Sequence, residues 1–210
     1  MNDIQTRSVA TTTHGRVLVR EGDQGRLLVG FHGYGENAER HMGELLRIPG
    51  ANHWRVASVQ ALHRFYNQKT GEVVASWMTK EDREQAIEDN VGYVRAVVGE
   101  LGPTGVIVFA GFSQGAATAY RAAKSMLCNG LIILGGDVPP DVSAHGSVQL
   151  PHVLLGRGER DDWYVHEKFE KDLSFLRTHA AGLTTCVFEG GHEWLDVFRN
   201  AAGAFLAQWK

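Results

Sequence analysis

The stretch that decides the fold is VIVFAGFSQGAATAYRAAKSM, residues 106–126. Its first five residues are apolar and predict a buried strand, whereas the alanine-rich run 116–126 predicts a helix. Between them lies Gly111-Phe112-Ser113-Gln114-Gly115, a G-x-S-x-G pentapeptide. In a sharp strand-to-helix turn this pattern exposes a serine hydroxyl above a sheet, and the glycines leave room where strand and helix pass closely. Ser113 is therefore the predicted nucleophile; a glycine-rich turn with an idle serine is the alternative.

Outside this stretch, short apolar runs alternate with amphipathic ones, which predicts an α/β protein with a mostly parallel central sheet flanked by helices. A length of 210 residues is near the usual size of one domain, so a single domain over residues 1–210 is expected. The expected strands are 16–20, 27–31, 56–60, 106–110, 131–134, 152–155 and 185–188.

Two helices are readable from their apolar spacing. One begins near Thr79, with Thr79 and Asp82 as an N-cap pair, and ends at Gly102-Pro103. The other lies at the carboxyl terminus and is expected to pack in the core. The apolar face of the first helix consists of Ile87, Val91, Val94, Val98 and Leu101, and that of the last of Leu195, Phe198, Ala202, Phe205 and Trp209.

Two stretches lack this periodicity. Residues 61–78 carry Phe65, Tyr66 and Trp77 and are interpreted either as a functional surface loop or as a loop whose aromatic residues fill the edge of the core. Residues 135–150 contain Pro139-Pro140 and are too short for a separate cap domain. We therefore expect no large cap domain and a fairly open site.

A serine hydroxyl is a weak nucleophile at neutral pH, so Ser113 requires a base, which in this kind of fold follows an acid late in the chain. His192 lies on a glycine-rich loop after the last expected strand and is the best placed of ten histidines. The orienting acid should follow the preceding strand, where the loop carries Glu159, Asp161 and Asp162. Asp161 is the predicted acid, because Asp162 directly precedes a helical stretch and suits a helix cap.

Acyl transfer develops negative charge on the substrate oxygen, which preset N–H donors stabilise. The backbone N–H of Gln114, directly after the nucleophile, is the first predicted donor. The second should come from the loop after an early strand, where the sequence reads Phe31-His32-Gly33-Tyr34-Gly35. The N–H of Tyr34 is the predicted second donor, since the glycines on either side let the backbone turn toward the substrate.

Composition argues against several classes of function. Twenty-one basic and 24 acidic residues give a net charge of −3 without a Lys/Arg-rich block, so nucleic acid is not an expected partner. The amino terminus lacks the features of a signal peptide and no run approaches membrane-spanning length, which predicts a soluble, cytoplasmic protein. Cys128 and Cys186 fit no ligand spacing, so buried free thiols are expected and no metal or cofactor is predicted.

In this order along the chain, the HGYG loop, the GFSQG pentapeptide, Asp161 and His192 resemble the phospholipase/carboxylesterase family of α/β-hydrolases, which includes the acyl-protein thioesterases. The resemblance spans nearly the whole chain. It implies an α/β-hydrolase fold, oxyanion donors at Tyr34 and Gln114, and the family acid at Asp161, three residues after a glycine. The family also has a tryptophan lining its site in a short S-W segment, which implies that role for Trp77; Gly33 is the other expected substrate-binding residue.

Two departures from the family pattern leave the acid assignment and the substrate open. The Asp-Pro-x-Val-Pro that follows the family acid is here Asp161-Asp162-Trp163-Tyr164-Val165, and Glu36 stands where an aspartate is common. The related dienelactone hydrolases use a cysteine nucleophile, whereas this chain has Ser113. The predicted activity is that of a carboxylesterase-type serine hydrolase acting on a small-molecule ester or thioester through an acyl-enzyme. A peptidase or amidase with the same triad, or a non-catalytic ligand-binding protein on this fold, is the alternative.

Overall fold

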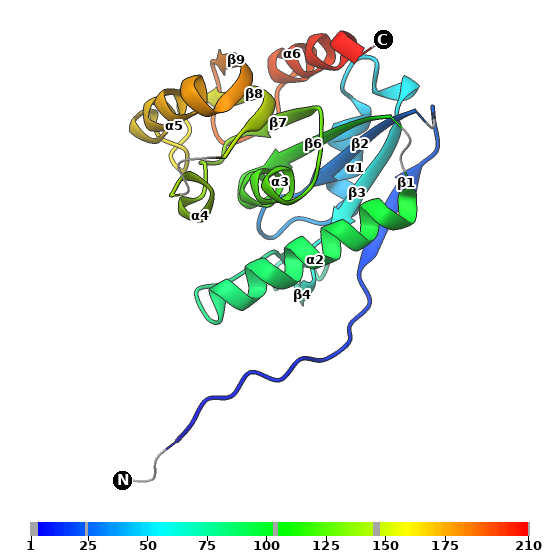
Figure 1. Ribbon diagram of the computed structural model, residues 1–210, viewed down its shortest axis with the longest axis vertical. Helices are drawn as coiled ribbons and strands as arrows, with labels where there is room; N and C mark the ends of the chain where they lie inside the picture. Colours follow the sequence, from blue (N-terminus) through cyan, green and yellow to red (C-terminus); the bar gives the residue numbers. More distant parts are fainter. Residues whose placement is uncertain (1–3, 24, 103–104, 145–147, 210) are drawn as a thin grey trace.

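A seven-stranded sheet forms the centre of the computed structural model, which describes residues 4–23, 25–102, 105–144 and 148–209 (Figure 1). The strand order is β1-β3-β2-β6-β7-β8-β9. β1 runs antiparallel to β3, and every other neighbouring pair is parallel. The strands are β1 (Arg16–Arg20), β2 (Arg26–Phe31), β3 (Arg55–Gln60), β6 (Val106–Phe112), β7 (Gly130–Leu134), β8 (Leu150–Gly158) and β9 (Ala180–Phe188).

Helices cover both faces of this sheet, as predicted (Figure 1). Successive residues of β2 point to opposite faces: Leu27 and Val29 pack toward α2, α3 and α5, whereas Leu28 packs toward α1 and α6. This is why the central strands are apolar at every position. The helices are α1 (Ala38–Leu46), α2 (Arg83–Leu101), α3 (Gln114–Ser125), α4 (Pro140–Ser143), α5 (His166–His179) and α6 (Asp196–Leu206), with short 3₁₀ turns at Ala51–His53 and Ala207–Trp209.

All seven expected strands are present, but β8 and β9 are longer than predicted. β9 begins at Ala180, five residues before the expected start at Thr185. It is an edge strand paired only with β8, and its residues are mostly exposed or half-buried. Because such a strand needs no continuous apolar run, its first half carries no recognisable signal in the sequence.

The stretch 61–78, expected to be an irregular loop, contains a two-stranded antiparallel hairpin of β4 (His63–Tyr66) and β5 (Val73–Ser76). All four residues of β4 are exposed, so no alternation of buried and exposed residues marks it as a strand. An isolated bridge between Glu36 and Ala75 ties the hairpin to the loop after β2. The hairpin is thus attached to the loop that was predicted to supply an oxyanion donor.

The predicted start of α2 is wrong. The helix begins at Arg83, and its N-cap residue Asp82 has φ 44° and makes no side-chain cap hydrogen bond. The Thr79 hydroxyl instead accepts a hydrogen bond from the N–H of Glu81 at 3.2 Å, in a turn before the helix. The buried face is also shifted by one residue at several positions. Gly102 ends the helix at φ 55°, as expected, whereas Pro103 lies outside the described residues.

The residues buried on α2 are Ala86, Asn90, Val94, Val97 and Leu101, while Ile87 and Val98 are only partly buried against them. The carboxyl-terminal helix follows its prediction more closely. Phe198, Ala202 and Phe205 are buried, Leu195 is the N-cap residue, and Trp209 packs against Phe205.

The carboxyl ends of β2, β6, β7, β8 and β9 meet at one edge of the sheet, because these strands are parallel. The chain reverses its winding direction between β2 and β6, since β3 lies beyond β2 and β7 lies beyond β6. Such a reversal opens a crevice at the carboxyl edge, where ligands of open α/β sheets commonly bind. Between β7 and β8 the described residues hold only the four-residue helix α4, so no cap covers the edge from there.

Cys128 and Cys186 are free thiols, and both are partly buried rather than fully buried. Burial raises the pKa of Cys128 to about 12 and also raises that of Cys186, so both thiols are protonated at neutral pH. A protonated thiol is a poor nucleophile. None of the described helices is both long and apolar enough to span a bilayer.

Candidate active site

Ser113 is the single residue between the end of β6 and the start of α3, where the chain turns sharply. Its backbone has φ 53° and ψ −117°, and it is one of two described non-glycine residues with positive φ. Such a conformation costs an L-residue on the order of 1–3 kcal/mol. A Cβ added to Gly115 would lie 2.0 Å from the carbonyl oxygen of Phe31, and one added to Gly111 would lie 2.4 Å from that of Gly115. Only glycine fits at these two positions, so the pentapeptide forms the strained turn expected of a nucleophile.

Asp161 and His192 form a hydrogen-bonded pair at the same sheet edge, from the loops after β8 and β9. The Nδ1 of His192 lies 2.8 Å from the Oδ2 of Asp161. The Oδ1 of Asp161 accepts the backbone N–H groups of Trp163 at 2.9 Å and Tyr164 at 2.8 Å. Since the carboxylate only accepts, Nδ1 carries the proton and the Nε2 of His192 is left as an acceptor.

The carboxyl group of Asp161 is held ionised despite its burial. Its side chain is only 1% exposed. Burial alone would raise the pKa of Asp161, but the hydrogen bonds from His192 and from the amides of Tyr164 and Trp163 outweigh it and hold that pKa below the ordinary value. Asp162 makes no comparable contact with His192 among the described residues, so the geometry favours Asp161 of the two.

Ser113 and the His192–Asp161 pair adjoin two successive glycines directly after β7, the pair next to Gly135 and Ser113 next to Gly136. A Cβ on Gly135 would lie 3.0 Å from the imidazole of His192, and one on Gly136 would lie 2.5 Å from the carbonyl oxygen of Ser113. The imidazole also packs on Phe112, with ring centroids 4.9 Å apart. In the part of the chain that the structure describes, the Ser113 hydroxyl makes no hydrogen bond to His192. Nucleophile–base hydrogen bonds often form fully only with substrate bound.

His32 sets the backbone direction in the loop after β2. It is fully buried, its Nδ1 lies 2.7 Å from the carbonyl oxygen of Gly33, and its Nε2 accepts the N–H of Ala61 at 3.1 Å. These partners fix the neutral tautomer with the proton on Nδ1, and burial lowers the pKa of His32. In a trans peptide the C=O and the following N–H point in opposite directions. By holding the Gly33 carbonyl, His32 turns the N–H of Tyr34 the other way.

The neighbouring amides of this loop are already engaged. The N–H of Gly33 donates to the Oε2 of Glu36 at 2.8 Å, that of Gly35 to the carbonyl of Ala75 at 3.0 Å, and that of Glu36 to the carbonyl of Gly33 at 3.3 Å. Within the described residues, the N–H of Tyr34 has no such partner. Burial raises the pKa of Glu36. The loop therefore presents one unpaired donor, at the residue predicted to supply it.

This architecture is shared with solved structures of known proteins. No protein-family model matches the sequence, and no curated protein matches it significantly. Among solved structures, the chain is similar to esterase PE8, with a TM-score of 0.73 and 21% sequence identity over 93% of this chain and 99% of that one. The chain has the α/β-hydrolase fold.

Two further structures carry the family names that the sequence pointed to. One is a phospholipase/carboxylesterase from Dyadobacter fermentans, with a TM-score of 0.71 and 18% identity over 95% of this chain and 100% of that one. The other is acyl-protein thioesterase 2 from Zea mays, with a TM-score of 0.70 and 17% identity over 93% and 99%. The structural neighbours of this chain thus include the family that the sequence resembles, and the predicted fold is confirmed.

Gln114 has a backbone N–H and a side chain that are both placed by the turn after Ser113, and the sequence indicated only the first. Its N–H is the first of helix α3 and therefore has no partner within the helix. Its side chain is bonded in both directions: Oε1 accepts the N–H of Trp77 at 2.9 Å, and Nε2 donates to the carbonyl of Met78 at 2.9 Å. The side chain thereby ties the end of the hairpin stretch to the nucleophile turn.

Trp77 does not line an open site, contrary to the expectation drawn from the family. Its side chain is fully buried, and its Nε1–H donates to the carbonyl of His32 at 2.8 Å. It packs edge-on against Phe31 with ring centroids 5.6 Å apart. Trp77 therefore helps to hold the Tyr34 loop in place through the buried carbonyl of His32. Gly33, the other expected substrate-binding residue, is buried beside Phe112 and uses its N–H on Glu36.

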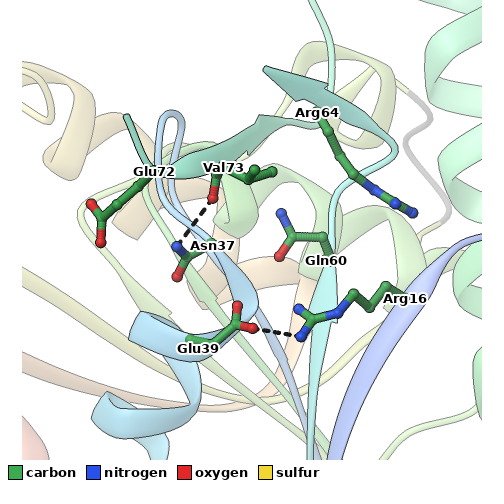
Figure 2. Close-up of a pocket in the computed structure, with 7 residues that line it drawn as sticks. All are labelled: Arg16, Asn37, Glu39, Gln60, Arg64, Glu72 and Val73. Atoms are coloured by element: carbon green, nitrogen blue, oxygen red, sulfur yellow. Dashed lines mark hydrogen bonds and ion pairs between the residues drawn. The ribbon is translucent and has the colours of Figure 1, made fainter. Parts of the chain in front are cut away.

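Two cavities lie near these loops, and one of them borders the imidazole. It has a volume of about 430 Å³ and is lined by Glu36, Arg40, Glu44, Phe112, His192, Glu193 and Trp194. The other, of about 420 Å³, lies beside the hairpin and contains none of the predicted catalytic residues (Figure 2). In Figure 2 the amide of Asn37 donates to the carbonyl of Val73, at 3.2 Å, which is a further tie between hairpin and loop. Of these two cavities, the one beside His192 includes a predicted catalytic residue, and Ser113 is in the lining of neither.

Proposed function

We propose that this α/β-hydrolase is a serine esterase that cleaves a carboxylic ester or thioester of a small molecule. Similarity in fold to esterases and thioesterases suggests ester hydrolysis as the general activity. The observation that carries the more specific proposal is the strained Ser113, between two obligatory glycines, at the same sheet edge as the hydrogen-bonded pair of His192 and Asp161.

In the proposed reaction, the Ser113 hydroxyl attacks the substrate carbonyl while the Nε2 of His192 takes its proton. The Oδ2 of Asp161 keeps the proton on Nδ1 and stabilises the imidazolium that forms. The imidazolium then protonates the leaving alcohol or thiol, and water hydrolyses the acyl-enzyme by the same steps. Negative charge on the carbonyl oxygen is stabilised by the N–H groups of Tyr34 and Gln114.

The leaving group distinguishes this proposal from a peptidase or amidase, which would use the same groups. No contact in the described residues selects for an amide, so we retain the ester as the proposed substrate. A non-catalytic ligand-binding protein would have no need for an ionised, buried Asp161 bonded to His192, nor for backbone strain at Ser113.

The test is hydrolysis of a panel of nitrophenyl esters and acyl thioesters by the wild-type chain and by Ser113→Ala. We expect Ser113→Ala to lower kcat by roughly 10⁶-fold, because the members of a triad act as a unit. Ser174→Ala is the matched control, since Ser174 is exposed on α5 and its hydroxyl donates to the carbonyl of Glu170. Undiminished hydrolysis by folded Ser113→Ala would overturn the proposal.

A further inference from the structure

A second buried carboxyl group lies behind the proposed acid, on α5. Asp172 is 4% exposed, and burial raises its pKa to about 6. One of its oxygens, Oδ2, accepts two hydrogen bonds: from the phenol of Tyr164 at 2.8 Å and from the backbone N–H of Val138 at 3.0 Å. The two donors belong to different loops, which follow β8 and β7. Asp172 is therefore the point at which these two loops are tied together.

Tyr164, one of the two donors to Asp172, also binds the proposed acid Asp161. The backbone N–H of Tyr164 donates to the Oδ1 of Asp161, and its carbonyl accepts the Nε–H of Arg157 at 3.1 Å. Its ring is 1% exposed and packs edge-on against Phe169. Tyr164 is thus held at both its phenol and its backbone. A shift of the phenol would be transmitted to the amide that holds Asp161.

Val138, the other donor to Asp172, belongs to the loop after β7, which contacts both the proposed nucleophile and the proposed base. The loop after β7 begins with Gly135, against the imidazole of His192, and Gly136, against the backbone of Ser113. The N–H of Ser113 also donates to the carbonyl of Leu134 at 2.9 Å, just before the loop. The position of this loop therefore sets how closely Ser113 and His192 approach. Val138, three residues further along, is where Asp172 anchors it.

We propose that Asp172 is a positioning residue that fixes the loop after β7 relative to the loop of Asp161, and so sets the alignment of Ser113 with His192. The inference rests on the proposed function, since it assigns Asp172 a part in the same reaction. Burying a carboxyl group among apolar residues costs stability unless hydrogen bonds offset that cost. A role as the shared hydrogen-bond acceptor of two loops explains why a carboxyl group is buried at this position, where an apolar side chain could fill the same space.

The test compares three substitutions by kcat and KM. Asp172→Leu keeps the branched shape, with somewhat larger methyl groups, but removes the acceptor. It should lower kcat by roughly 10- to 100-fold with KM changed less than about three-fold, because small misplacements of reacting groups are costly. Asp172→Asn keeps an oxygen that can accept from both donors, and should restore kcat to within about three-fold of wild type. Tyr164→Phe removes one of the two bonds and should lower kcat by about three- to ten-fold.

The matched control is Tyr120→Phe. Tyr120 is buried on α3, its pKa is raised by burial and by the charge of Asp172, and its hydroxyl has no hydrogen-bond partner among the described residues. Removing that hydroxyl should leave kcat unchanged. Wild-type kcat in folded Asp172→Leu would overturn the inference, as would an equal loss in Asp172→Asn and Asp172→Leu. If Asp172→Leu does not fold, wild-type kcat in Tyr164→Phe overturns it.

Failure of this inference is distinguishable from failure of the proposed function. Activity retained by Ser113→Ala would contradict the esterase mechanism whatever the Asp172 variants do. Conversely, an inactive Ser113→Ala combined with unaltered Asp172 and Tyr164 variants would leave the mechanism standing and remove only the positioning role.

Discussion

At the β2 and β6 end of the sheet edge the proposed reacting groups are set by the backbone, whereas at the β8 and β9 end they are set by ionisable side chains. Ser113 and the donors at Tyr34 and Gln114 depend on a positive φ, on glycines that admit no Cβ, and on the direction of peptide bonds. Asp161 and His192 depend on hydrogen bonds and on burial.

The two ends of the site are therefore sensitive to different kinds of substitution. A group placed by the backbone is displaced by steric changes, and the expected damage is to folding as well as to catalysis. A group placed by hydrogen bonds is displaced by removing one donor or acceptor, which costs about 1–3 kcal/mol of stability and requires no movement of the backbone. Substitutions of the first kind should therefore be followed through the free energy of unfolding. Those of the second kind should be followed through kcat and through the dependence of stability on pH.

Apart from removal of the nucleophile itself, the largest effect is expected at the side-chain end. Asp161→Asn should lower kcat by about 10⁴-fold, because an amide can donate to Nδ1 and so favour the wrong tautomer of His192. Asp162→Asn should lower kcat by less than about three-fold, since Asp162 is exposed and does not contact the imidazole. Steady-state kinetics on a nitrophenyl ester distinguishes them. Similar, mild losses in both variants would contradict the choice of Asp161.

At the backbone end, Gly115→Ala should lower the free energy of unfolding by about 3 kcal/mol or more, because its Cβ would collide with the carbonyl of Phe31 and backbone must move. The control is Gly99→Ala on α2, where an added Cβ meets nothing within 4 Å. That substitution should stabilise the helix by roughly 0.5–1 kcal/mol. Urea denaturation measures both, and a Gly115→Ala variant as stable as wild type would contradict the described turn.

Asp172, at the side-chain end, should make the stability of the protein depend on pH. Because burial raises the pKa of Asp172 from 3.8 to about 6, its contribution to stability is fully present below pH 3.8 and is lost as the pH rises through 6. The charged groups that face it are Asp137 and Lys171, with the phenols of Tyr164 and Tyr120. Between pH 4 and pH 8, the free energy of unfolding of wild type should fall by up to roughly 3 kcal/mol relative to that of Asp172→Asn.

Urea denaturation of both proteins across this pH range gives the difference directly. A difference that does not change with pH would show that Asp172 keeps an ordinary pKa in the folded protein. Measuring the difference between the two variants removes the contribution of other titrating groups, which both proteins share.

The smallest effect is expected for Trp77→Phe, which leaves the buried carbonyl of His32 without its donor. The Tyr34 loop should then be less well placed, and kcat/KM should fall by about ten-fold. Trp54→Phe is the control, since Trp54 is equally buried but packs against Trp209 and Arg26. It should cost stability without a change in kcat/KM. Equal losses of activity in both would contradict a specific role for Trp77.

The backbone half was the easier one to predict from sequence, because its determinants are contiguous. The pentapeptide around Ser113 and the loop around Tyr34 each follow an apolar strand, and the structure places both at one edge. The side-chain half needed a choice among nearby carboxylates, because spacing alone does not say which of Asp161 and Asp162 faces the imidazole. Whether these residues catalyse the proposed reaction stays a prediction.

Other features left no readable local signal. The hairpin of β4 and β5 is short and its first strand is fully exposed. The tie from Asp172 joins residues that are 8 and 34 positions away along the chain. The burial of Trp77 likewise depends on contacts with His32, 45 positions away. Long-range side-chain contacts of this kind are set by the fold as a whole, so no single stretch of sequence predicts them.

The most direct test of the central claim is labelling of the folded protein with a fluorophosphonate, followed by mass spectrometric mapping of the modified residue. We expect one label per chain on Ser113, abolished by Ser113→Ala and slowed at least about 10³-fold by His192→Ala, because the hydroxyl needs its base. Modification at another serine, or a rate of labelling indifferent to His192, would contradict it.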